Sequence, residues 1–509
     1  MLTANGNIYS KYNPIKIIEN ISKSYNYIIL GIGLGYELKQ VIENTEGIVY
    51  VIDRDKTYYN LIIELKHLTE IINNPRVKFL FGDEYKNIDL KEINSYKIFN
   101  NENLTQIDVT YFFKVIKFFS IKKSSKHKIS FYEHITIADD CIEALKNIGY
   151  EVVKMKFSTK DKMIENVMQE CPDYIFTINL SEKVSEISNI LSIPYIAWVV
   201  DVPAYSLYSD LLERKNILAF TCDSSMAREL KDKGFKNIHY MPVAVNTNRL
   251  DNIKLESDDL QKYCCDVSFL GTTGIENEFN KYMSNLLSKE TIEKIDEIFY
   301  KQLLNQSQFI IKDMIDNELI DRIQLETGYK IASETYLSKK AKLAFLLGRK
   351  LNEIQRINMV KKLSEIYNFY VYGDENWSEI DSKYIQYRGY AEHFVEMPKV
   401  FKCSKVNINY TRIYVEAGLP MRVFDILGSK GFLATNYKED VSKYFVDGKD
   451  LVVYRDAKDL VEIINYYLNN EKERQTIILN GYDKVKKYHT YEKRLKEMMN
   501  ISNSYFKLE

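Results

Sequence analysis

The sequence predicts an α/β protein built on parallel sheets, and three observations lead to that fold class. Short apolar segments alternate with amphipathic helical patterns along most of the chain, which is typical of parallel sheets. Glycine directly follows several of the apolar segments, as is common where a strand turns into a helix. One segment, 276–366, has a helical pattern throughout and contains no proline. We therefore expect several Rossmann-like domains and one helical insertion.

Length and composition limit the class of protein. The 509 residues predict about three domains at roughly 100–200 residues each. With 45% hydrophobic and 28% charged residues, the chain has the composition of a globular rather than a disordered protein. The 70 Lys and Arg residues balance 71 Asp and Glu residues, which argues against a general nucleic-acid partner.

Targeting signals are missing from the pattern. No apolar segment approaches the roughly 20 residues of a membrane span, and the N-terminus lacks the basic and apolar regions of a signal peptide. The six cysteines form no CxxC pair, so we expect reduced thiols and a cytoplasmic protein.

Residues 1–122 are expected to form an N-terminal, methyltransferase-like Rossmann domain. Its strands are predicted at Tyr27–Leu30, Ile48–Ile52 and Val77–Phe81. Gly31-x-Gly33-x-Gly35 follows the first strand and Asp53 ends the second, which is the arrangement of a site for a ribose-containing ligand. A domain without any ligand is the other interpretation. Asp53-Arg54-Asp55 also matches a DxD metal signature, but its position at a strand end does not favour a metal.

Two further Rossmann-like domains follow, at 128–255 and 264–490. Strands of the first are predicted at 128–132, 150–154, 174–178, 195–200, 217–221 and 237–241. Strands of the second are predicted at 265–270, 369–372, 385–387, 406–409, 431–434 and 451–453, with the helical insertion 276–366 between the first two.

The C-terminal third carries the most specific motifs. They are Val406–Asn409, Gly418–Gly428, Gly431–Thr435, Asp447–Asp456 and Tyr488–Arg494. In this order they resemble the bacterial glycosyltransferases of the CgeB-like (spore maturation protein B) family, closely over about 264–495 and more weakly over 128–255. The segment Gly31–Leu38 is similar to the leading domain of motility-associated flagellin glycosylation proteins.

This resemblance implies a GT-B fold and a transferase activity. Two Rossmann-like domains would bind a UDP- or GDP-linked sugar between them, and the helix 491–509 would cross back to the first of them. The acceptor would be a hydroxyl of a protein, such as flagellin, or of a cell-surface glycan, with no metal or other cofactor required. A methyltransferase using the N-terminal domain and a catalytically inactive GT-B-like binding protein are the alternatives, and a homo-oligomer remains open.

The resemblance also implies where the donor nucleotide binds. Gly418-Leu419-Pro420 would begin a helix whose free backbone N–H groups face phosphate. Arg422 would contact the diphosphate, and Asp425, where the family usually has Glu, would bind ribose hydroxyls. The other candidates are turn residues at strand ends: Gly271, Thr272, Tyr372, Gly373, Gly389 and Tyr390.

An inverting transferase needs one carboxylate or imidazole to take the proton of the acceptor hydroxyl. Asp201 and His134 are the favoured candidates, because each follows a strand and would project from the carboxyl edge of its sheet. The remaining candidates are Asp139, Asp140 and Asp223. His489 is expected to belong to the returning helical segment instead.

Overall fold

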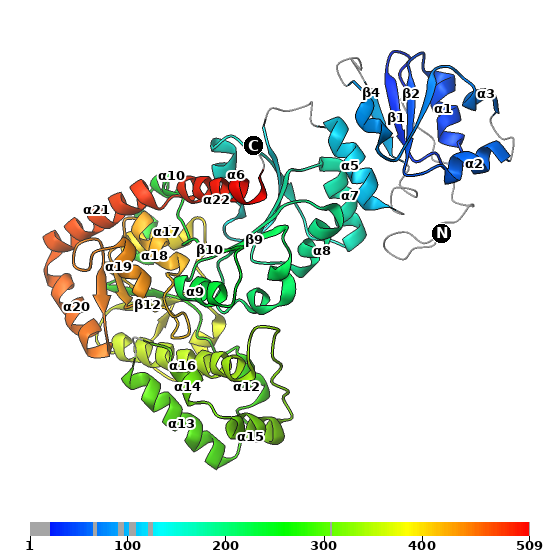
Figure 1. Ribbon diagram of the computed structural model, residues 1–509. Helices are drawn as coiled ribbons and strands as arrows, with labels where there is room; N and C mark the ends of the chain where they lie inside the picture. The colour runs from blue at the N-terminus through cyan, green and yellow to red at the C-terminus, as the bar shows by residue number, and fades with distance from the viewer. Residues whose placement is uncertain are drawn as a thin grey trace. The chain divides into compact units, whose positions relative to one another are not determined.

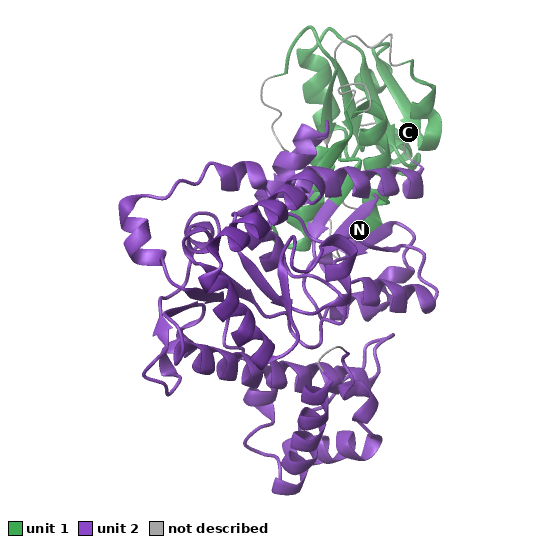
Figure 2. Ribbon diagram, turned by 90° about the vertical axis from the view of Figure 1, so that its left-hand side faces the viewer, with its two compact units in different colours: residues 1–130, 155–175, 186–193 green, residues 131–154, 176–185, 194–509 purple. Residues whose placement is uncertain are grey.

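The computed structural model describes residues 21–64, 69–89, 96–100, 108–120, 126–305 and 308–507. These residues contain one four-stranded and two six-stranded sheets with parallel pairing, so the expected α/β fold class is confirmed (Figure 1). The chain forms two compact units (Figure 2). One contains the described residues up to 130 with 155–175 and 186–193, and the larger one contains 131–154, 176–185 and 194–507. These units do not follow the sheets, and the expected domain limits remain predictions.

The first sheet has the strand order β3-β2-β1-β4. Its strands are β1 (Asn26–Leu30), β2 (Val49–Asp53), β3 (Val77–Phe81) and β4 (Tyr96–Asn100). The helices around it are α1 (Tyr36–Asn44), α2 (Thr57–Glu64), α3 (Thr69–Ile72), the 3-10 helix η1 (Gly82–Asn87) and α5 (Val109–Ser120). Ile29, Val41 and Val51 lie in its core.

The second sheet has the order β10-β9-β8-β7-β5-β6. Its strands are β5 (Lys128–Tyr132), β6 (Glu151–Met155), β7 (Tyr174–Ile178), β8 (Tyr195–Val199), β9 (Ile217–Thr221) and β10 (Ile238–Tyr240). Its helices are α6 (Ala138–Asn147), α7 (Lys160–Glu170), α8 (Glu182–Leu191), η2 (Tyr205–Tyr208), η3 (Asp210–Glu213), α9 (Ser224–Asp232), α10 (Thr247–Asp251) and α11 (Ser257–Tyr263). Every residue of β7, β8 and β9 is buried, as continuous apolar runs predict for central parallel strands.

The third sheet has the order β13-β12-β11-β14-β15-β16. Its strands are β11 (Val267–Leu270), β12 (Phe369–Tyr372), β13 (Gln386–Tyr387), β14 (Val406–Asn409), β15 (Leu433–Asn436) and β16 (Val452–Tyr454). Its helices are η4 (Glu375–Glu379), α17 (Glu396–Cys403), α18 (Met421–Gly428), α19 (Glu439–Tyr444), α20 (Ala457–Asn469), α21 (Glu471–Tyr488) and α22 (Tyr491–Phe506).

Between β11 and β12 the chain is helical, with α12 (Glu278–Tyr282), α13 (Lys289–Leu304), α14 (Ile311–Met314), α15 (Asn317–Thr327) and α16 (Lys339–Ser364). These helices have a hydrophobic core of their own, to which α16 contributes Leu343 and Leu351. Further along the same 26-residue helix, Val360 and Leu363 pack in the core of the third sheet. The helical segment and the third sheet therefore share α16.

The last helix, α22, returns to the second sheet. It packs against α6, and Asn147 Nδ2 donates a hydrogen bond to Glu492 Oε1 at 2.7 Å (Figure 1). The ring of Tyr491 meets Trp198 of β8 edge to face. Two six-stranded parallel sheets joined by a returning C-terminal helix form a GT-B arrangement. Among the described residues, no helix is both long enough and apolar enough to cross a membrane.

Candidate functional site

A pocket of about 380 Å³ lies between the second and third sheets, within the larger unit. On one side it is lined by residues that follow β5, β8 and β9, and on the other by residues at the ends of β11 and β14 and at the start of α18. The carboxyl ends of strands from two parallel sheets thus face one space, which is where α/β folds place their ligands.

Arg422 and Asp425 lie on the third-sheet side of this pocket, at the start of α18. Pro420 is the N-cap of the helix, and no side chain caps it. The closest approach between the guanidinium of Arg422 and the carboxylate of Asp425 is 3.9 Å. Burial lowers the pKa of Arg422 and raises that of Asp425, so each charge is poorly solvated. Arg422 also contacts Met397 Sδ and lies over the ring of Phe401.

Two more arginines line the pocket, and neither was singled out from the sequence. Arg412 is an exposed residue of the loop after β14. Arg356 comes from α16 and is only 8% exposed. Its Nη1 donates a 2.9 Å hydrogen bond to the carbonyl oxygen of Thr272. The signal in the sequence is an arginine on the apolar face of a long helix, four residues before the buried Val360.

Four predicted donor residues line the pocket: Gly271, Thr272, Gly418 and Leu419. A Cβ on Gly271 would come within 2.8 Å of the Phe269 ring. A Cβ on Gly418 would come within 2.8 Å of the Cys222 carbonyl oxygen, which belongs to the second-sheet side. Glycine at position 418 therefore permits the close approach of the two walls.

The remaining predicted donor residues are only partly brought to the pocket. Tyr390 lines it and is 73% exposed. Gly373 and Gly389 line a neighbouring hollow together with Tyr390. Tyr372 lines neither, since it is buried to 3% exposure in β12, where burial raises the pKa of its phenol.

On the second-sheet side, Asp201 is an exposed residue that lines the pocket directly after β8. Asn179 holds it in place, since Asn179 Nδ2 donates a 2.6 Å hydrogen bond to Asp201 Oδ2. His134 does not itself line the pocket, but its Nδ1 lies 3.3 Å from the hydroxyl of Thr136, which does. Burial lowers the pKa of His134, and the nearby Asp201 raises it in part, so the imidazole is neutral at pH 7.

The other three candidate bases have structural roles. The exposed Asp139 forms an ion pair with Lys154 at 2.5 Å. The buried Asp140 forms one with Arg249 at 2.9 Å. Asp223 is 1% exposed and caps α9. Of the four aspartates considered as bases, Asp201 alone lines the pocket.

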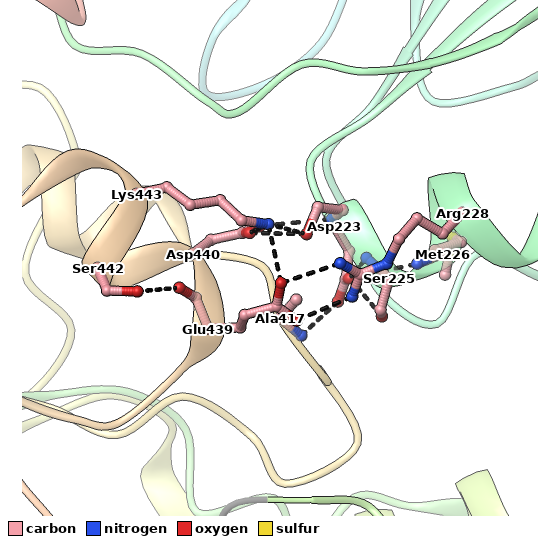
Figure 3. A network of polar contacts seen from close by, with 10 residues as sticks. Asp223, Ser225, Met226, Arg228, Ala417, Glu439, Asp440, Ser442 and Lys443 are labelled. Atoms are coloured by element: carbon pink, nitrogen blue, oxygen red, sulfur yellow. Dashed lines mark hydrogen bonds and ion pairs between the residues drawn. The ribbon is translucent and has the colours of Figure 1, made fainter.

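A polar network next to Asp223 ties the two walls together (Figure 3). The carboxylate of Asp440, at the start of α19, accepts a 2.6 Å hydrogen bond from the hydroxyl of Ser224 in α9. Lys443 Nζ lies 2.6 Å from the same carboxylate. On the exposed edge of the network, Arg228 and Glu439 form a bidentate ion pair.

His489, expected to be part of the returning segment, is buried at the end of α21, where Arg494 donates a hydrogen bond to its Nδ1.

The glycine-rich loop of the smaller unit has a separate geometry. Gly31, Gly33 and Gly35 have φ angles of 82°, 55° and 81°, which L side chains rarely adopt. The carboxylate of Asp53 accepts a 3.1 Å hydrogen bond from the backbone N–H of Ile32 in this loop. The second acid of the DxD sequence, Asp55, forms an ion pair with Arg54. Nowhere in the described ranges do three or more His, Cys, Asp or Glu side chains form a group suited to a metal ion.

Part of the chain is similar to one known protein family. Residues 353–500 match the Glycosyl transferase-like family, and this range contains Arg356, Arg412, Arg422 and Asp425. That part of the chain is therefore glycosyl transferase-like in sequence. No curated protein matches the chain significantly. The likeness of the N-terminal domain to flagellin glycosylation proteins remains a prediction.

The solved structures that match this chain include three with very low sequence identity. Anabaena Alr3699/HepE, solved in complex with UDP and glucose, is 9% identical, with coverage of 74% of this chain and 100% of that chain and a TM-score of 0.42. The sucrose-phosphate synthase of Thermosynechococcus elongatus is 8% identical, with coverage of 75% and 100% and a TM-score of 0.47. A glycosyltransferase from Rickettsia africae is 12% identical, with coverage of 76% and 100% and a TM-score of 0.42.

Proposed function

We propose that this protein is a glycosyltransferase that moves a sugar from a UDP- or GDP-linked donor to an acceptor hydroxyl. One observation carries the proposal: a pocket between two parallel sheets has arginines on one wall and the exposed carboxylate of Asp201 on the other. The arginines suit an anionic diphosphate, and the carboxylate suits the removal of a proton. The glycosyl transferase-like sequence of residues 353–500 supports the same activity.

The donor would bind at the start of α18. Arg422 and the N-terminal end of this helix would neutralise the diphosphate. The side chain carries a positive charge, and the helix end, whose N–H groups no described side chain caps, carries a partial one. Asp425 would accept hydrogen bonds from the ribose hydroxyls. Among the described residues, no donor is hydrogen-bonded to the Asp425 carboxylate, so its oxygens are available.

The second-sheet side of the pocket would supply the catalytic base. Asp201 takes the proton from the acceptor hydroxyl, and the acceptor oxygen forms a bond to the anomeric carbon of the sugar. The bond between that carbon and the diphosphate oxygen breaks, and the nucleoside diphosphate leaves with the bonding electron pair. Asn179 fixes Asp201, and His134 at the same sheet edge is the alternative base.

The test of this assignment is Asp201→Asn, measured by hydrolysis or transfer from UDP-glucose and GDP-mannose. We expect the variant to bind UDP or GDP as the wild type does and to lose at least 100-fold in turnover, in line with the roughly 10²–10⁴-fold contribution of a general base. Asp139→Asn is the matched control, because Asp139 is an exposed aspartate of α6 that pairs with Lys154 and does not line the pocket. Normal turnover in Asp201→Asn would assign the role of base to His134. Normal turnover after substitution of His134 as well would end the proposal.

The finer parts of the proposal concern the acceptor and the metal. A macromolecular acceptor, a protein such as flagellin or a cell-surface glycan, is supported by the first sheet, because none of the residues described around this sheet lines the pocket. Transfer of labelled sugar to small alcohols as efficiently as to protein or glycan would contradict it. The arginines would neutralise the charge of the diphosphate, so we propose that the reaction needs no metal. We also propose that it occurs in the cytoplasm.

A further inference from the structure

We infer that Arg356 of α16 is a ligand of the donor diphosphate, so that the helical segment supplies part of the donor site. The inference rests on the proposed function, which it deepens by adding a phosphate-binding residue from outside the α18 motif. It would make α16 a shared element of the helical core and of the chemistry, in agreement with its packing in both cores.

The first argument is that Arg356 is a buried cation without a counter-ion. It is 8% exposed, and among the described residues it has no carboxylate ion-pair partner. Its guanidinium donates hydrogen bonds to the Thr272 carbonyl oxygen at 2.9 Å, the Thr272 hydroxyl at 3.4 Å and the Tyr410 carbonyl oxygen at 3.5 Å. Burying a charge is costly unless it is paired, so a guanidinium in this state is suited to an anion that arrives with the substrate.

The second argument is that Arg356 lines the pocket and carries an N–H donor that no acceptor among the described residues meets. Arg356 lines the pocket, and its buried Nε has no hydrogen-bond partner within the part of the chain that the structure describes. Arginine has five N–H donors in a planar fork that matches phosphate oxygens. An unpartnered donor on a side chain more than nine-tenths buried therefore points to a missing acceptor.

The third argument is the gathering of like charge. Arg356, Arg412 and Arg422 line the same pocket, and repulsion from Arg412 and Arg422 adds to burial in lowering the pKa of Arg356 to about 10. Such an arrangement is unfavourable in the empty protein and becomes favourable when a diphosphate, which carries at least two negative charges, lies between the three side chains.

A purely structural role is the competing explanation, since Arg356 could serve only to hold the turn at Thr272. The two roles differ in which part of a ligand they affect. A phosphate ligand matters for UDP and for pyrophosphate but not for uridine, whereas a damaged turn weakens the binding of all three. The variants are Arg356→Met, which keeps length and loses charge, and Arg356→Lys, which keeps the charge.

The matched control is Arg349→Met. Arg349 lies two turns earlier on the same helix, pairs with Glu278 at 3.6 Å and does not line the pocket. For Arg356→Met we expect calorimetry to show UDP or GDP, whichever the wild type binds, about 10- to 150-fold weaker. The free nucleoside should change less than threefold, and Arg349→Met should match the wild type.

Three results would overturn the inference. The first is an unchanged affinity of folded Arg356→Met for the nucleoside diphosphate. The second is an equal loss of affinity for the nucleoside and for the diphosphate. The third is a loss of diphosphate affinity in Arg356→Lys as large as in Arg356→Met, together with weakened uridine binding. If Arg356→Met does not fold, Arg356→Lys decides alone. Weaker binding of UDP and pyrophosphate with unchanged binding of uridine would then support the inference. A wild type that binds neither UDP nor GDP would end the proposed function, whereas binding lost in Arg422→Ala but not in Arg356→Met would end only this inference.

Discussion

The network at Asp440 offers a sharp test of how the walls of the pocket are held together. Asp440 is fully buried, and its carboxylate accepts hydrogen bonds from the Ser224 hydroxyl at 2.6 Å and the Ser224 N–H at 3.4 Å. It also pairs with Lys443 at 2.6 Å. Asp440→Asn keeps the shape of the side chain and removes the charge and one acceptor oxygen.

The magnitude follows from what is left behind. Breaking a buried ion pair by removing one partner costs about 3–5 kcal/mol. Lys443 is 38% exposed and keeps Glu439 at 3.1 Å, so its charge is not stranded. We therefore expect the lower end, about 3 kcal/mol, in the free energy of unfolding of the larger unit. Glu439→Gln is the matched control: its partner Arg228 is exposed, and an exposed pair contributes less than about 1 kcal/mol.

Tryptophan fluorescence during urea unfolding measures this difference directly. The chain has two tryptophans, Trp198 and Trp377, and both are fully buried in the larger unit. Asp440→Asn should lower the unfolding midpoint strongly, and Glu439→Gln should leave it almost unchanged. Equal effects of the two substitutions would refute the view that the buried half of the network holds the walls together.

Three further predictions concern the same unit. Gly418→Ala should lower stability by about 1–3 kcal/mol and weaken nucleotide binding, because its Cβ would meet the Cys222 carbonyl oxygen at 2.8 Å; an unchanged urea midpoint would contradict this contact. Burial, and then Arg494, lower the pKa of His489 from the ordinary 6.5 to about 3. The unfolded chain therefore binds this proton first, and stability should fall by about 1.4 kcal/mol per pH unit as the pH drops from 6.5 towards 3. His489→Gln should remove this contribution, and identical slopes of unfolding free energy against pH in both proteins would disprove it. Finally, sugar transfer should continue in EDTA at an unchanged rate, and restoration of lost activity by Mg²⁺ or Mn²⁺ would show that a metal is required.

Much of the fold could be predicted because central parallel strands are continuous apolar runs. Lys128–Tyr132, Tyr174–Ile178 and Ile217–Thr221 occur with the predicted bounds. The strand Tyr96–Asn100 was not predicted, since Lys97 and Asn100 leave it only a short apolar run and no glycine turn marks its end.

The site was less predictable, because its residues meet only in three dimensions. Asp201 and Asp223 follow strand ends in the sequence, and Asp140 lies at the start of a predicted helix. Only the fold shows that Asp140 and Asp223 are buried in structural contacts. Arg356 lies 66 residues before Arg422 in a helical pattern, so no local spacing connects it to the α18 motif. Tyr372 is the opposite case: its strand-end position suggested the pocket, but its side chain points into the protein interior.

The central claim is that the pocket between the second and third sheets binds a nucleoside diphosphate through the start of α18. Isothermal titration of UDP and GDP into the wild type, Arg422→Ala and the surface control Arg228→Ala tests it most directly. We predict that one of the two nucleotides binds the wild type and the control equally well. Arg422→Ala should bind it about 10- to 150-fold more weakly, because roughly 1.5–3 kcal/mol of charge-assisted hydrogen bonding is lost. Equal affinity of a folded Arg422→Ala variant, or no binding of either nucleotide to the wild type, would contradict the claim.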